Sequence, residues 1–82
     1  MDKVLVVLAS YTSAYSVQSA LERKFGIMSK IVRAPSELSG LGCSYCLEFE
    51  RCYLKNALKL IRKSSISVRG IYDAKNMKLI NL

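Results

Sequence analysis

Residues 3–9 have the sequence Lys-Val-Leu-Val-Val-Leu-Ala, and this stretch decides the fold. Its β-branched and other apolar residues occupy successive positions, so both faces of an extended strand would be apolar. Such a strand belongs in the centre of a sheet. The run is far shorter than the ~20 residues that span a bilayer, and no signal cleavage site follows it. We therefore expect a cytoplasmic protein without a membrane segment.

Beyond this strand, helical and extended patterns alternate along the chain. Ser10, Thr12 and Ser13 offer N-cap side chains before a helix whose apolar positions recur every three and four residues. Gly26 follows the last of these positions, where a helix stop is expected. The patterns predict helices at 14–25 and 54–61, and further strands at 28–32, 45–50 and 67–72.

The order β-α-β-β-α-β predicts an α+β fold of the ferredoxin-like type. This fold is a two-layer sandwich with an antiparallel sheet of strand order 4-1-3-2 and both helices on one face. We expect it to occupy residues 1–73, followed by a tail at 74–82. Because the first strand is apolar on both sides, its open face must also be covered. The tail or a second copy could cover it, and we expect a homodimer through this face.

Thiols are nearly the only reactive side chains in this chain. The 82 residues hold three Cys, six carboxylates and no His, which excludes a Ser-His-Asp or Cys-His centre built within the chain. In a cytoplasmic protein the three Cys are expected to be reduced. Three thiols also fall short of the four ligands of a structural zinc site, so we expect no metal and no cofactor.

Cys43 is the candidate reactive thiol, at the end of a Gly- and Ser-rich loop over 35–42. In the predicted topology the first strand ends where the third begins, which brings Cys43 near the N-cap residues Ser10, Thr12 and Ser13. The amides and the dipole of a helix N-terminus favour a thiolate, and Arg33 would add to that field. A nucleophilic or sulfur-carrying Cys43 and a buried packing Cys43 both remain open.

Cys46 and Cys52 have weaker claims to a functional role. Cys43 and Cys46 form a Cys-x-x-Cys motif, which a thiol redox switch could use if Cys43 lies in the turn. Residues three apart along a strand point to opposite faces, which weighs against that convergence. Cys52 should lie at the opposite edge, near the start of the second helix. A site with three thiols would then have to be shared across a dimer.

The charge balance suggests an anionic partner. With 13 Lys and Arg against six Asp and Glu, the formal net charge is +7, which favours an acidic protein or nucleic acid. Lys55, Lys59 and Arg62 form a basic ridge on the second helix, a pattern that is more often a solvated face than a binding surface. The first strand lacks the aromatic residues on which RNA-binding modules of this fold stack bases, so nucleic acid is not favoured.

Several segments together resemble a known family. They are Tyr11-Thr-Ser-Ala14, 21–27, Pro35-Ser-Glu-Leu-Ser39, Cys43 and Val68-Arg-Gly-Ile-Tyr72. Over about residues 3–73 the chain resembles the small bacterial selenium/sulfur carrier-like proteins. The resemblance implies that Cys43 holds a persulfide or perselenide and passes it between donor and acceptor proteins. Such a protein would be a carrier rather than a turnover enzyme. The alternatives are a basic binding module with structural thiols, and the redox switch.

Overall fold

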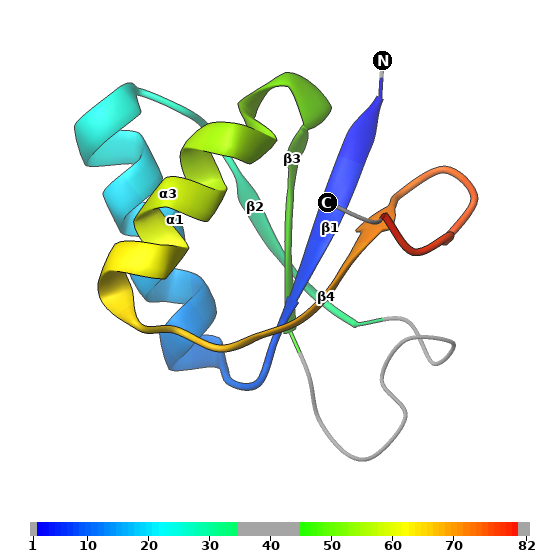
Figure 1. The fold of residues 1–82 in the computed structure, drawn as a ribbon, viewed down its shortest axis with the longest axis horizontal. Helices are drawn as coiled ribbons and strands as arrows, with labels where there is room; N and C mark the ends of the chain where they lie inside the picture. Colours follow the sequence, from blue (N-terminus) through cyan, green and yellow to red (C-terminus); the bar gives the residue numbers. More distant parts are fainter. Residues whose placement is uncertain (1, 35–44, 81–82) are drawn as a thin grey trace.

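The computed structural model describes residues 2–34 and 45–80. Its four strands form one antiparallel sheet in the order β2-β3-β1-β4, with two α-helices on one face (Figure 1). This is the predicted ferredoxin-like α+β sandwich with the predicted strand order. The elements are β1 (Lys3–Leu8), α1 (Tyr11–Phe25), β2 (Lys30–Arg33), β3 (Tyr45–Glu50), the 3-10 turn η1 (Arg51–Tyr53), α3 (Leu54–Ser64) and β4 (Val68–Asp73).

The central strand β1 is buried on both faces. It pairs antiparallel with β3 on one side and with β4 on the other. Its alternate residues Val4, Val6 and Leu8 are each 0% exposed and belong to the core beneath α1 and α3. Leu5 and Val7 face the other way and are 3% and 1% exposed. The prediction that this strand needs a cover on each side is confirmed.

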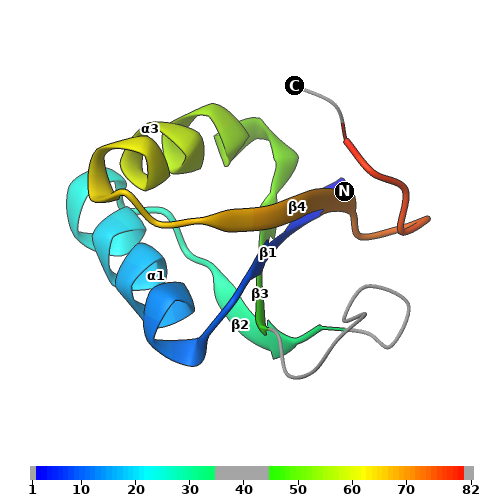
Figure 2. The same ribbon diagram turned by 60° about the horizontal axis from the view of Figure 1, so that its bottom comes forward.

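Residues after β4 supply part of the second cover. Ala74 and Met77 pack against the cluster that contains Leu5 and Val7. The Ala74 N–H donates to the carbonyl of Lys3 at 3.0 Å, which fixes the start of the segment beside β1. Figure 2 shows this segment and the two helices on opposite sides of the sheet. The homodimer through this face stays a prediction.

The second strand begins two residues later than the sequence pattern suggests. Gly26 ends α1 in the left-handed conformation (φ 66°), and its N–H donates to the Glu22 carbonyl at 3.0 Å. Ile27 then turns into the core at 4% exposure, whereas Met28 is 72% exposed. The Gln18 side-chain amide donates a hydrogen bond to the Ser29 carbonyl at 3.1 Å. These contacts keep the first apolar residues out of the sheet, and pairing starts at Lys30. At the other edge, β4 ends one residue beyond the predicted 67–72.

The end of α3 contains a strained residue. Ser65 terminates the helix with φ 56° and ψ 27°, a left-handed conformation that costs a residue with a Cβ more than glycine.

We expect Ser65→Gly to raise the free energy of unfolding by about 0.5–1 kcal/mol. The matched change Ser64→Gly, within the helix, should lower it. Urea denaturation of both variants tests this, and destabilisation by Ser65→Gly would contradict it.

Candidate functional site

The first turn of α1 presents unpaired backbone donors. Ser10 is the N-cap residue, and its Oγ accepts the Ser13 N–H at 3.2 Å. Its hydroxyl also donates to Ser13 Oγ at 3.1 Å. Within the described residues, the N–H groups of Tyr11 and Thr12 have no acceptor, and no acidic residue lies in this turn. This end of the helix therefore carries a partial positive charge that no carboxylate in its first turn offsets.

The sheet brings the start of β3 and the end of β2 to the same place. Tyr45 pairs with Leu8 on β1 and with Arg33 on β2. Its ring contacts that of Tyr11 edge to face, with centroids 5.5 Å apart and planes at 84°. The end of β1 and the start of β3 therefore lie at the same edge, as the topology predicts, and Arg33 lies beside Tyr45. Cys43, two residues before Tyr45 in the sequence, lies outside the described residues.

Cys46 is a buried thiol on the other face of the sheet. It is 0% exposed and packs with Leu5, Val7 and Ala34, on the face away from α1 and α3. Burial raises the pKa of this thiol to about 11, so it is protonated at neutral pH. The sheet thus brings Cys46 to the correct end of the molecule but places it on the side away from the first turn of α1. Its surroundings are those of a packing residue.

Cys52 lies in η1, at the opposite end of the sheet, as predicted. Glu50, two residues earlier, pairs with Lys3 at the beginning of β1. The five residue steps of β3 span roughly 16 Å, which separates this exposed thiol from Tyr45. In the part of the chain that the structure describes, no three His, Cys, Asp or Glu side chains are grouped as metal ligands. Nor does any described helix have the length and apolarity to cross a membrane.

The basic ridge of α3 is exposed. Lys55, Lys59 and Arg62 are all solvent-exposed, while Ala57, Leu60 and Ile61 of the same helix are buried. The helix leads into β4, which begins at Val68 opposite Leu8 of β1. The last turn of α3 therefore lies toward the end of the sheet where α1 begins, and its first turn lies toward the other end (Figure 1). Arg62 belongs to the last turn and Lys55 to the first.

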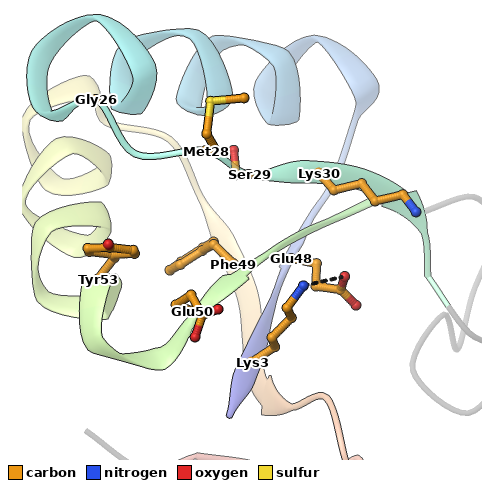
Figure 3. Close-up of a pocket in the computed structure, with 9 residues that line it drawn as sticks. All are labelled: Lys3, Gly26, Met28, Ser29, Lys30, Glu48, Phe49, Glu50 and Tyr53. Atoms are coloured by element: carbon orange, nitrogen blue, oxygen red, sulfur yellow. Dashed lines mark ion pairs between the residues drawn. The ribbon is translucent and has the colours of Figure 1, made fainter. Parts of the chain in front are cut away.

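Two surface features escaped the sequence analysis. Tyr11 and Tyr15 are 53% and 57% exposed, beside the predicted site. Their spacing of four residues, off the apolar face of α1, was the available signal. The second feature is a cavity of about 430 Å³ at the other end of the sheet (Figure 3). Its walls come from β1, the segment between α1 and β2, β2, β3 and η1, so no local sequence pattern indicates it.

The fold is that of a small ferredoxin-like protein. Its candidate site is the N-terminus of α1, which lies beside the start of β3. The family described as "Putative Se/S carrier protein-like" matches residues 3–73. The chain belongs to this family. No curated protein and no solved structure matches the chain.

The buried Cys46 thiol should make stability depend on pH. Its pKa is about 11 in the folded protein and 9.0 without burial, so the unfolded chain releases the proton first as pH rises. The stabilisation is complete below about pH 9 and is lost toward pH 11. Urea denaturation should show the stability difference between wild type and Cys46→Ala shrinking over this interval.

The matched control is Cys52→Ala, which removes an exposed thiol. Its stability difference from wild type should stay constant across the same pH interval. A constant difference for Cys46→Ala as well would contradict the buried, protonated state of Cys46.

Proposed function

We propose that this protein carries sulfur or selenium as a persulfide or perselenide on Cys43, and passes it to a partner protein. The observation that supports the proposal most is the family match over residues 3–73. Cys43 is the position that the resemblance assigns to the carrier thiol. In this proposal the protein is a cytoplasmic carrier and completes no turnover of its own.

The surroundings of Tyr45 favour a thiolate nearby. The amides of Tyr11 and Thr12 begin α1 without an acceptor among the described residues, and Arg33 ends β2 opposite Tyr45. Helix N-termini and neighbouring cations lower thiol pKa values, and the thiolate is the nucleophile. The other two thiols fit the role less well. Cys46 is buried with a raised pKa, and Cys52 lies at the opposite end of the sheet.

The transfer is a thiol–persulfide exchange with no net oxidation. The Cys43 thiolate attacks the terminal sulfur of a donor persulfide, forming a new S–S bond while the donor's own S–S bond breaks. The donor leaves as a thiolate, and the proton stays with the transferred sulfur. Delivery repeats the step, with an acceptor thiolate attacking the terminal sulfur and Cys43 leaving. A perselenide follows the same course with selenium as the terminal atom.

The basic ridge is the proposed docking face for donor and acceptor proteins. Lys55, Lys59 and Arg62 are exposed along one helix, and the whole chain carries a net charge of +7. Complementary charge speeds encounter with an acidic partner. The position of Arg62, toward the end where α1 begins, would bring such a partner close to the candidate site.

The test is sulfur loading from a low-molecular-weight persulfide, glutathione persulfide, followed by mass spectrometry of each cysteine peptide. We expect Cys43 to gain one sulfur at least about tenfold faster than Cys52, because a lowered pKa raises the thiolate fraction. Cys43→Ser should keep the fold, as judged by circular dichroism, and lose the fast loading. Cys52→Ser should retain it.

Equal loading rates for Cys43 and Cys52, or fast loading that survives Cys43→Ser, would contradict the proposal of a carrier thiol at Cys43.

The alternative hypothesis, a basic nucleic-acid-binding module, makes a different prediction. It predicts salt-sensitive binding of RNA that is lost in K55E/K59E/R62E and unchanged in Cys43→Ser. The structure gives that rival little support. On the sheet face away from the helices, β1 and β3 carry Leu5, Val7, Cys46 and Glu48, and none of these is a base-stacking aromatic.

A further inference from the structure

The outer edge of β2 is open within the described part of the chain. β2 pairs with β3 on its inner side, and no described strand pairs with its outer side. The edge at β4 is different, because Leu79 bridges to Tyr72 and the Ile80 N–H donates to the Ile71 carbonyl at 2.8 Å. An open edge presents unpaired backbone donors and acceptors to another chain.

The side chains of this edge have a definite pattern. Ile31 packs with the core under the helices and Val32 with the cluster on the opposite face. By strand alternation, Arg33 lies on the helix face and Lys30 on the other. Both cations are exposed, and neither pairs with a carboxylate among the described residues. Glu48, next to Lys30 in the sheet, instead pairs with Lys3 at 4.0 Å.

A cavity lies beyond the start of β2. Pairing between β2 and β3 stops at Lys30 and Glu48, so β3 continues for two residues without a β2 partner. The cavity of about 430 Å³ opens at this gap, and Figure 3 shows Phe49 and Tyr53 among its walls. Met28 at its rim is 72% exposed. Ser29 Oγ, also in the wall, is buried and finds no hydrogen-bond partner in the described residues.

We propose that the β2 edge binds an extended acidic segment of a partner protein by strand addition. Residues opposite Lys30 and Arg33 would be acidic, and the two between them, opposite Ile31 and Val32, apolar. Past the residue opposite Lys30, the segment reaches the cavity, which suits an aromatic side chain. On its inner side, β2 already pairs in this way at two positions, since Glu48 of β3 lies opposite Lys30 and Leu47 lies opposite Ile31. The proposal does not depend on sulfur transfer.

A second copy of the chain fits this edge poorly. Antiparallel pairing of β2 with itself about a two-fold axis would place Lys30 opposite Arg33 of the other copy. Both pairs of directly opposed residues at the ends of the four-residue strand would then be of like charge, which destabilises a sheet. An acidic segment turns the same two positions into attractive pairs.

The test uses a fluorescein-labelled probe peptide, Gly-Glu-Val-Ile-Glu-Gly-Phe-Gly, with binding followed by fluorescence anisotropy. We expect saturable binding that weakens about tenfold or more in K30E/R33E, because two attractive cross-strand pairs become repulsive. The matched double reversal K75E/K78E should leave the affinity unchanged, because both lysines are exposed in the segment after β4, at the other edge of the sheet. A peptide with Lys in place of both Glu should not bind. Amide shifts in NMR spectra should concentrate at residues 29–33 and 49–53.

Three results would overturn the proposal. The first is no saturable binding of the probe, which would mean that Lys30 and Arg33 only keep copies of the chain from pairing. The second is equal weakening in K75E/K78E, which would assign the binding to the net charge of the chain and not to the β2 edge. The third is self-association that K30E/R33E changes, measured by analytical ultracentrifugation, which would make a second copy the occupant.

Discussion

The burial of β1 on both faces is the constraint on which the rest of this structure depends. One row of its side chains lies under α1 and α3, and the other row lies under Ala34, Ala74 and Met77. Full burial of each Val or Leu side chain stabilises the fold by about 1.5–3 kcal/mol. A strand that is apolar on both faces must lie in the centre of the sheet, and strands with both polar and apolar residues form the edges. The short, cationic β2 therefore lies at an edge.

The central position of β1 also fixes the geometry of the candidate site. Two residues separate the end of β1 from the start of α1, and β3 runs antiparallel beside β1. The helix N-terminus and the start of β3 are therefore neighbours, and the Tyr11–Tyr45 contact reports this directly. The same arrangement sends Cys52 and the cavity to the far end of the sheet. The proposed thiol site and the cavity at the start of β2 thus lie at opposite ends of one sheet.

Much of the fold could be predicted because local signals agree with it. Ser10 and Gly26 bound α1 where capping rules place them, and the alternation over 45–50 gives β3 with its apolar face toward the helices. The start of β2 could not be predicted, because Met28 looks like the first residue of a strand and only tertiary contacts exclude it. The cavity was equally hidden, since it exists where β2 stops short of the end of β3.

The site was predictable only in outline. Topology placed Arg33 and the N-cap residues beside the start of β3, but the engagement of the Ser13 N–H by Ser10 is a detail of side-chain geometry. Because the Ser13 N–H is bound to Ser10, the backbone N–H groups of Tyr11 and Thr12 remain as the donors of this helix end. Cys46 was grouped with this site from its sequence spacing. Its position on the opposite face follows from the pleat of β3, in which neighbours alternate.

The central claim is that Cys43 is poised as a thiolate, and the most direct measurement is its pKa. Iodoacetamide alkylation across a pH series, with each cysteine quantified by mass spectrometry, gives this value with Cys46 and Cys52 as internal references. We expect Cys43 to react fastest, with a pKa clearly below the ~8.5 of a free thiol. A Cys43 that titrates like Cys52, or that is as unreactive as the buried Cys46, would contradict it.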